Sequence, residues 1–580
     1  MTRPKGPSRR SLISAVGAGT LLTYAGAQPA TAFAAPVPQP GTDPVEVATG
    51  PSRTAVTVAA HDPAVYTRAA VGKLTVTPVS GTPGRTEVGS ADGPLAVLTH
   101  GSRTVVLTGP ERTFREDKRT VDDTFRRTVA PGGWGLSPGG GAWETANGTA
   151  GDYEVVPGAG VVRVPANSSV SRHVTLKDDQ VADLDAVITG RFEQDPADAA
   201  RSFALTFGYQ GPADHCRARL SFAAGGAVTL HLEQAVSATS VTQLTTPVAV
   251  SPDLPAGSSW CIRVNRTGGR IQARAWRADL AEGTNWQITV DGRPPAPGRI
   301  GIRAAADSTA LAAELRIPRV RILTATWTAP VTVVHRSWVR VLPEPYDGVW
   351  TPGVEQHLRG WLGSTAPDAL AYGFHFLPGA PRVTSYRSGP PEHEAPVLGE
   401  SDYGPARTGG GREEGADFHE YMGVNWTFAR VPTGSLTKTA APRFLGALDC
   451  SGYIRMVYGY HLGVPLAHES DHTSPGLLPR TAADMAARAP GTRIAHSATA
   501  TPPPLTALQI GDLVFFDAES DPVDEIDHVG IYLGRDTADI PRFLSSRKTP
   551  NGATAADLGG PSTLTGTGTY ATKLRTVHRL

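Results

Sequence analysis

The sequence has no formal net charge, only one long apolar run and only three cysteines. Lys and Arg together number 54 in 580 residues, the same as Asp and Glu together, so the formal net charge is zero. That balance gives no electrostatic reason to expect binding to nucleic acid or to an anionic membrane surface. Because no stretch after the N-terminal region is long and apolar enough to span a bilayer, we expect no membrane span in the mature chain.

The N-terminal region has the pattern of an export signal. A basic start at Arg3 to Arg10 precedes an uncharged, mostly apolar run from Ser11 to Ala27. Small residues suited to a cleavage site follow at Thr31 to Ala35, and Ser8 to Ile13 resembles a twin-arginine signal. We therefore expect residues 1–34 to be a cleaved signal peptide and the mature protein to be secreted or in the cell wall. A transmembrane anchor is the alternative, but the run is short and rich in Gly and Ala.

The three cysteines divide into a pair and a single thiol. Cys216 and Cys261 both lie in segments that alternate like strands, and an exported chain meets oxidising conditions. We expect a disulfide between them. Cys450 is then left unpaired, which is a liability in an exported protein unless the thiol is used chemically.

Length and composition indicate several domains rich in turns. At 580 residues the chain is too long for one ordinary core, and its 64 glycines and 50 prolines favour short strands over long helices. Changes in pattern predict a signal peptide (1–34), a flexible leader (35–55), a small β-rich segment (56–119), a β-sandwich (120–325), an accessory region (326–439) and a catalytic domain (440–580).

Residues 120–325 have the pattern of an antiparallel β-sandwich. Strand-like runs recur there with Gly, Asp and Asn between them. The pattern from Asp123 through Gly132–Gly135 to Trp143 resembles laminin-G/concanavalin-like jelly-roll modules. The resemblance implies a glycan ligand, and a structural spacer is the alternative. In one topology the sandwich is an insertion between 56–118 and 326–440.

Cys450 has the surroundings of a nucleophile. A thiol attacks carbonyls as the thiolate, and a helix N-terminus or a nearby imidazolium lowers the pKa of a thiol. Asp449 is a good N-cap residue, and apolar residues follow Cys450 with helical spacing at Ile454, Val457, Tyr458 and Leu462. We expect Cys450 in the first turn of a helix, with a lowered thiol pKa and backbone N–H groups placed for an oxyanion.

A histidine at the start of a later strand is the expected base. Gly511–Phe516 predicts a turn into a buried strand, and His528–Gly534 predicts a second strand. Antiparallel pairing of these strands would bring His528 to the helix of Cys450. There it could act as general base and then as general acid.

Three ordered blocks resemble the NlpC/P60 family: Asp449–Tyr453, Gly511–Phe516 and His528–Gly534. The resemblance covers about residues 440–550. It implies a multidomain chain with a papain-like α+β C-terminal domain beside the sandwich. It also implies cysteine-peptidase activity on peptidoglycan stem peptides, usually between γ-D-glutamate and the following diamino acid. We expect no cofactor.

The same resemblance assigns the site residues by position. Cys450 is the nucleophile and His528 the base. By the same analogy Asp449, Ser451 and Tyr403 are expected to contact the substrate, at its amine end. The family usually orients its histidine with a polar residue, often another histidine, on the next strand. Here the register places Ser545 at that position, with Asp536, Asp539 or a backbone carbonyl as alternatives.

Rival functions remain open at this point. His468–His472 satisfies the H-E-x-x-H zinc pattern, but Pro465 and Pro475 bracket it and favour a turn over the helix that zinc ligation needs, so we expect no metal. A catalytically weak or inactive wall-binding protein is a second possibility. A papain-like acyltransferase or amidase is a third, because the thioester intermediate does not dictate the acceptor.

Overall fold

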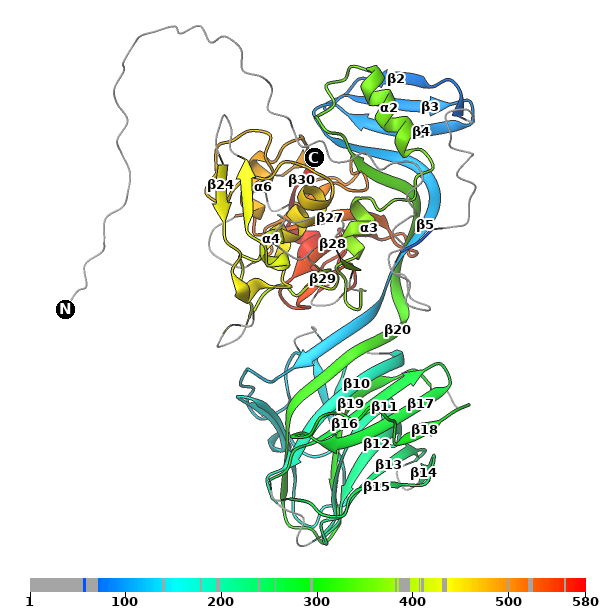
Figure 1. Cartoon of the computed structure of the whole chain (residues 1–580), viewed down its shortest axis with the longest axis vertical. Helices are drawn as coiled ribbons and strands as arrows, with labels where there is room; N and C mark the ends of the chain where they lie inside the picture. The colour runs from blue at the N-terminus through cyan, green and yellow to red at the C-terminus, as the bar shows by residue number, and fades with distance from the viewer. Residues whose placement is uncertain are drawn as a thin grey trace, which may run out of the picture.

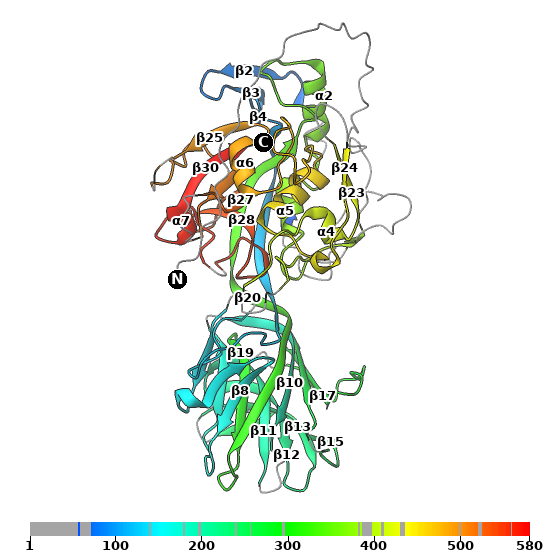
Figure 2. The same ribbon diagram turned by 90° about the vertical axis from the view of Figure 1, so that its left-hand side faces the viewer.

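The protein forms two lobes joined by a pair of long strands in the computed structural model (Figures 1 and 2). The lower lobe is a β-sandwich, and the upper lobe holds the far end of one of its sheets and the C-terminal α+β domain. The predicted signal peptide and leader lie outside the described residues. The structure describes residues 56–58, 71–137, 141–177, 180–194, 199–237, 240–255, 257–292, 296–380, 383–384, 397–405, 407, 411–429, 435–497, 499, 501–519, 525–557 and 560–580.

The first sheet, here called the spanning sheet, reaches through both lobes. Its strands are antiparallel, as the sequence predicted for the sandwich. In order they are β18 (Ile288–Val290), β17 (Arg270–Arg277), β16 (Trp260–Thr267), β10 (Val181–Phe192), β20 (Ala313–Val341), β5 (Thr104–Asp123), β4 (Gly93–Thr99), β3 (Arg85–Ser90) and β2 (Thr75–Val79). Off this path, β1 (Val56–Val58) pairs with β5, β8 (Ala159–Val164) pairs with β20, and β7 (Tyr153–Val156) pairs with β8.

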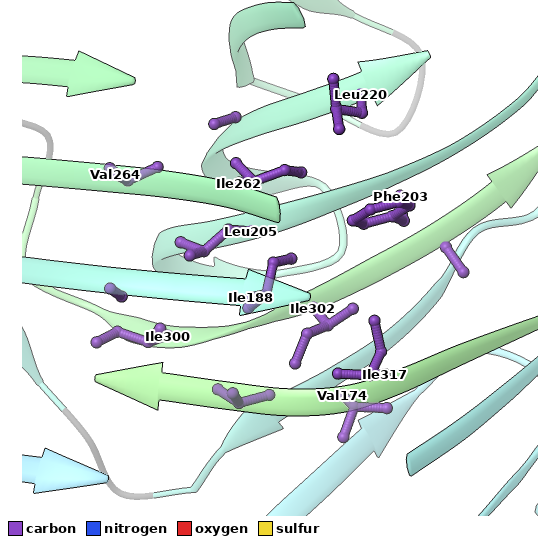
Figure 3. Close-up of a cluster of buried hydrophobic side chains, with 14 of the residues drawn as sticks. Val174, Ile188, Phe203, Leu205, Leu220, Ile262, Val264, Ile300, Ile302 and Ile317 are labelled. Atoms are coloured by element: carbon purple, nitrogen blue, oxygen red, sulfur yellow. The ribbon is translucent and has the colours of Figure 1, made fainter. Parts of the chain in front are cut away.

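A second sheet, here called the facing sheet, completes the sandwich. Side chains that alternate along its strands pack against the spanning sheet, among them Phe203, Leu205 and Ile302 (Figure 3). A short 3-10 helix, η2 (Ala150–Asp152), precedes β7. The order is β14 (Val241–Gln243), β13 (Val228–Ala235), β12 (Asp214–Phe222), β11 (Arg201–Gly211), β19 (Arg299–Ala306), β9 (Arg172–Leu176) and β6 (Trp143–Ala146), with β15 (Val248–Ser251) also on β13.

Strands β5 and β20 connect the lobes. They pair from Val320↔Asp123 in the sandwich to Val341↔Thr104 in the upper lobe, with register shifts along the way. Because the strands before and after the sandwich pair with each other, the sandwich is an insertion in the upper lobe. The domain boundaries expected near 119 and 325 fall inside these two continuous strands.

The upper lobe combines the end of the spanning sheet with the C-terminal domain. Strands β2 to β4 are covered by α2 (Pro352–Trp361), through a core that includes Val88, Trp338 and Leu358. The end of the chain is fastened to β5, since the backbone N–H groups of Arg103 and Thr104 both donate to Leu580 O, at 2.8 and 2.7 Å.

The C-terminal domain is an antiparallel sheet with short helices packed on it. The sheet order is β25 (Thr492–His496), β30 (Leu574–Arg579), β26 (Leu513–Phe516), β27 (His528–Arg535), β28 (Pro541–Arg547) and β29 (Gly552–Thr554). Two short hairpins, β21 (Val383–Thr384) with β22 (Val397–Leu398) and β23 (Trp426–Ala429) with β24 (Ser435–Lys438), lie outside it. The helices are α3 (Ala369–Phe374), α4 (Phe418–Met422), η3 (Pro442–Phe444), α5 (Cys450–Ile454), the π-helical η4 (Arg455–His461), α6 (Ala482–Arg488) and α7 (Thr569–Lys573). None of the helices among the described residues is long and apolar enough to cross a membrane.

The expected Cys216–Cys261 disulfide is wrong. Both cysteines are free thiols, as is Cys450. Cys216 lies on the facing sheet and belongs to the core between the sheets. Cys261 lies on the spanning sheet between two core residues, Trp260 and Ile262, so its side chain points to the outer face, where Thr189 Oγ1 lies 3.4 Å from its sulfur. The alternation of each strand was predicted, but not the face on which each thiol lies.

A buried carboxylate fastens the connecting strands to the C-terminal domain. Glu116 of β5 accepts hydrogen bonds from Thr554 Oγ1 at 2.7 Å, Ala555 N at 2.6 Å and Ala556 N at 2.9 Å. Glu116→Ala should destabilise the upper lobe by about 3 kcal/mol, because it leaves buried backbone N–H groups unpaired. Urea denaturation of the full chain measures this. The control Glu111→Ala alters an exposed side chain on the same strand and should change stability by less than about 0.5 kcal/mol. Equal effects would contradict the anchoring role.

Candidate active site

Cys450 is the first residue of α5, as its sequence context predicted. Asp449 caps the helix, and its Oδ1 accepts from Gly452 N at 2.7 Å. Gly452 has no room for a side chain, since a Cβ there would lie 2.1 Å from Ala416 O. The loop that precedes α4 is therefore packed directly against the first turn of α5, where the thiol lies.

His528 is the first residue of β27, and α5 packs against β27 and β28 (Figure 2). The Cys450 thiol donates to Asp527 O at 3.8 Å, and the backbone N–H of Val529 donates toward the sulfur. The thiol thus contacts the backbone on both sides of His528. The fold brings together two residues that the sequence places far apart.

Ser545 contacts the histidine from the neighbouring strand. Ser545 lies on β28 and is fully buried, and its Oγ is 3.1 Å from His528 Nε2. The two aspartates considered as alternatives are bound elsewhere: Asp536 pairs with Arg542 at 2.7 Å and Asp539 with Arg535 at 3.3 Å. Among the described residues, Ser545 is the side chain in place to orient the ring through Nε2.

Burial dominates the protonation of the pair. It raises the pKa of Cys450 to about 12, with Asp449 and Glu414 adding to the rise and Arg480 opposing it. Burial likewise lowers the pKa of His528 to about 3, with Arg547 and Lys548 adding to the fall. The sequence predicted a lowered thiol pKa. In this structure the loss of hydration outweighs the field of one short helix, so the resting pair is a neutral thiol and a neutral imidazole.

Because the Cys450 thiol is neutral at rest, its rate of alkylation should depend on pH. Far below its pKa, the thiolate fraction of Cys450 rises about tenfold per pH unit. Alkylation of Cys450 by iodoacetamide should therefore accelerate continuously from pH 6 to pH 9, as followed by peptide mass spectrometry. A rate that is constant between pH 5 and pH 8 would indicate a preformed thiolate–imidazolium pair and would contradict this assignment.

Two of the predicted substrate-binding residues, Asp449 and Ser451, flank Cys450 in the chain. The third, Tyr403, lies near enough to interact with Cys450 electrostatically. Tyr403 is 2% exposed, and its hydroxyl donates to Glu414 Oε1 at 3.3 Å. Burial, followed by the nearby Cys450 and Asp449, raises the pKa of Tyr403. Ser451 donates to Asp449 Oδ1 at 3.2 Å, so all three side chains lie within one hydrogen-bonded and electrostatic group.

Arg480 and Asp417 complete the support of the nucleophile helix, and sequence reasoning did not assign them a role. Arg480 donates to both carboxylate oxygens of Asp449, at 3.1 and 2.7 Å, and to Ser451 Oγ at 2.7 Å. Asp417 accepts from Arg455 at 3.0 Å and lies 3.8 Å from Arg480 Nε. Arg480 stands in a Leu-Pro-Arg run between the blocks quoted above, which is the one signal the sequence offered.

An ion-pair group lies at the solvent side of the site. Lys548, which follows β28, pairs with Glu414 at 2.6 Å and also with Glu519. Their side chains are one-third to one-half exposed. Glu414 acts electrostatically on Cys450 and Lys548 on His528, so this group lies beside the pair. The Tyr570 ring, 5.1 Å from the imidazole, packs against His528.

These features define a thiol–imidazole site built on an α+β domain. Comparison with known families assigns that domain: residues 434–549 match the model of the NlpC/P60 family, and the chain carries an NlpC/P60 domain in its C-terminal part. Proteins of this family are typically cysteine peptidases or amidases. Tyr403, Glu414 and Tyr570 lie outside the matched residues, so other parts of the chain contribute to the surroundings of the site.

Among solved structures, similar folds include sugar-binding and sugar-cleaving proteins. The carbohydrate binding module CBM66 from Bacillus subtilis is 10% identical, with 30% of this chain and 91% of that chain covered and a TM-score of 0.23. The catalytic domain of an endo-1,3-beta-glucanase from Thermotoga petrophila is 10% identical, with 37% and 100% covered and a TM-score of 0.27. A beta-1,3-glucanase from Mycobacterium marinum is 15% identical, with 35% and 97% covered and a TM-score of 0.25. At these values the likenesses give no basis for a function. No curated protein matches the chain.

Proposed function

We propose that this protein is a secreted cell-wall hydrolase, exported by the twin-arginine-like signal. Its C-terminal domain is a cysteine endopeptidase that cleaves peptidoglycan stem peptides at the bond between γ-D-glutamate and the diamino acid. The observation that carries the proposal is the contact of the Cys450 thiol with the backbone on both sides of His528, together with Ser545 at His528 Nε2. The match of residues 434–549 to a family of peptidases and amidases supports it.

In the reaction, His528 takes the proton of Cys450 as the sulfur attacks the peptide carbonyl. The backbone N–H of Cys450, at the first turn of α5, faces the developing oxyanion. The imidazolium then gives its proton to the leaving amine, which leaves a thioester. A water molecule, deprotonated by His528, hydrolyses the thioester and restores the free thiol.

Because the resting pair is neutral, proton transfer has to accompany the attack. Ser545 holds the ring through Nε2, but a hydroxyl stabilises an imidazolium less than a carboxylate would. The buried Arg547 beside the ring also disfavours the imidazolium. This arrangement favours an enzyme that is slow until its substrate displaces water and supplies new contacts.

Asp449, Ser451 and Tyr403 are the proposed contacts for the amine end of the substrate. The Asp449 carboxylate already accepts from Gly452 and Arg480, so its negative charge is largely balanced within the protein. We propose that the part of its negative charge that is not balanced attracts the amine of the substrate. Tyr403 would form the part of the binding surface next to Glu414, to which its hydroxyl donates.

Digestion of purified peptidoglycan by the wild type and by Cys450→Ala, followed by mass spectrometry of the fragments, tests this function. The wild type should release fragments with a new D-glutamate terminus and a free diamino acid amine, and Cys450→Ala should release none. Cys261→Ala, which removes a thiol on the sandwich, is the matched control and should act like the wild type.

The alternatives predict different digests. Identical digests from the wild type and Cys450→Ala would overturn the peptidase assignment and favour a wall-binding protein without activity. Cleavage between the sugar and the first residue of the stem would identify an amidase. Products that carry a new acyl acceptor in place of water would identify an acyltransferase.

A further inference from the structure

Polar residues line the outer face of the facing sheet. On a sheet face that is turned toward solvent, such residues are ordinarily hydrated. The core side of these strands is apolar (Figure 3). On the other side, cross-strand partners from β9, β19, β11, β12 and β13 form two adjacent rows. The first row is His173, Arg303, Ala204, Arg219 and His231, and the second is Thr175, Gly301, Thr206, Arg217 and Glu233.

The charges of this face do not balance. Glu233 accepts from Arg217 Nε at 2.7 Å and from Arg219 Nε at 3.1 Å. Among the described residues Arg303 has no hydrogen-bonded carboxylate. Two of the three guanidinium groups in these rows therefore bind the one carboxylate there, and the half-buried Arg303 is the cation to which no carboxylate is hydrogen-bonded among the described residues.

The surrounding groups respond to this excess of positive charge. Burial, and then repulsion by Arg217 and Arg219, lowers the pKa of Arg303 to about 9. Burial, followed by repulsion from Arg303, lowers the pKa of His173 to about 2. Burying cations beside one another without an anion is costly, and a bound oxyanion would remove that cost.

Unpartnered polar atoms lie on the same face. His173 and Thr206 are fully buried and Tyr209 is 3% exposed. Within the part of the chain that is described, His173 Nδ1, Thr206 Oγ1 and the Tyr209 hydroxyl have no hydrogen-bond partner. Tyr209 pairs across the strands with Arg299, which places it on this face, and its ring lies 5.4 Å from those of His173 and His215. Buried polar atoms without partners in a native fold call for an explanation, and a bound ligand supplies one.

We propose that the outer face of the facing sheet binds an oxyanion group, a carboxylate or a phosphate, of an anionic wall polymer, with Arg303 as its principal contact. This inference rests on the proposed location of the enzyme at the cell wall, and it names the chemistry of the ligand that the sandwich holds. Arg217 and Arg219 supply further positive charge, and Thr206 and Tyr209 supply hydroxyl groups.

The face is suited to binding and not to sugar hydrolysis. Glycoside hydrolysis uses two carboxyl groups, one of which must carry a proton to donate. Although burial raises the pKa of Glu233, the hydrogen bonds and charges of Arg219 and Arg217 lower it to about 2, so Glu233 stays ionised. Glu144, at the edge of the sheet, pairs with Arg299.

Binding of the full-length protein to three polymers tests the proposal at fixed ionic strength. The probes are polygalacturonate as the carboxylate polymer, poly(glycerol phosphate) as the phosphate polymer, and laminarin as a neutral glucan, each measured by titration calorimetry. We expect binding to at least one polyanion and none to laminarin, and the preferred polyanion identifies the group.

Arg303→Gln should weaken polyanion binding at least tenfold without lowering the unfolding temperature of the sandwich, because Arg303 lacks a carboxylate partner. Arg270→Gln is the matched control: it removes the same charge from an exposed position on the spanning sheet, where Arg270 pairs with Asp291. Thr206→Val, nearly isosteric at a hydroxyl without a partner, should also weaken binding and serves if Arg303→Gln fails to fold.

No polyanion binding by the wild type, equal losses in Arg303→Gln and Arg270→Gln, or equal binding of laminarin would each overturn the proposal. Cleavage of soluble stem peptides is measured on the same variants. A variant that loses polymer binding but cleaves stem peptides at the wild-type rate would show that the two functions are separate. Failure of the peptidase assay in the wild type would bear on the proposed function alone.

Discussion

Replacement of His528 by alanine is expected to lower kcat/KM for stem-peptide cleavage by about 10³-fold or more. Without the imidazole, the buried Cys450 thiol, whose pKa is raised to about 12, has no proton acceptor in place. The contact with Ser545 Oγ is also lost, which leaves that hydroxyl without its ring partner. Initial rates on a synthetic stem peptide, with circular dichroism to verify folding, measure the effect.

His472→Ala is the matched control for this loss. His472 lies in the same domain but is well exposed, with Asp484 3.3 Å from its ring nitrogen. The variant should keep the wild-type rate, and it also tests the H-E-x-x-H pattern, whose residues form a turn as predicted. If His528→Ala kept more than about a tenth of the wild-type rate, His528 would not be the base. If His472→Ala lost activity, the dismissal of the H-E-x-x-H pattern would be wrong.

Replacement of Arg480 by methionine is expected to destabilise the C-terminal domain by about 3–5 kcal/mol, because removing one partner of a buried ion pair leaves an uncompensated charge. Arg480 is 8% exposed and binds Asp449 through both carboxylate oxygens. Its loss also removes the main charge that opposes the raised pKa of Cys450, so cleavage should slow in the protein that remains folded.

Urea denaturation of single and double variants measures the Arg480 effect. Asp449→Asn combined with Arg480→Met should be less destabilised than the sum of the single changes, since the two residues act as a pair. Arg443→Met, which alters an exposed arginine paired with Glu413, should change stability by less than about 1 kcal/mol. Additive single changes would show that the Arg480–Asp449 contact contributes little.

Much of the site could be predicted because its chemistry is local. The N-cap at Asp449, the first-turn position of Cys450 and the strand start at His528 depend on neighbouring residues and on periodicity, and these agree with the structure. Ser545 followed from the family resemblance together with the strand register, and its Oγ lies 3.1 Å from His528 Nε2. The catalytic roles of these residues stay predictions until the variants are measured.

The predictions that were wrong or missing concern quantities that depend on the whole fold. The pKa of Cys450 was expected to fall because the helix terminus is visible in the sequence, whereas the burial that raises it is not. The disulfide was wrong because alternation gives the period of a strand but not which sheet and which face each residue joins. The partners of Arg480 and Glu116 come from segments remote in the chain, and no local pattern indicates them.

By itself, the sequence determined the kinds of elements that carry Cys450 and His528 and predicted these two as the reacting groups, because capping, strand period and motif spacing act over a few residues. Only the tertiary structure decided how acidic the thiol is, which charges support it and how the sandwich joins the rest, through β5 and β20. It also gathered three arginines from two strands, β12 and β19, on the face that carries the single carboxylate of Glu233 from β13. Burial and the sum of nearby charges arise only when distant segments are packed together.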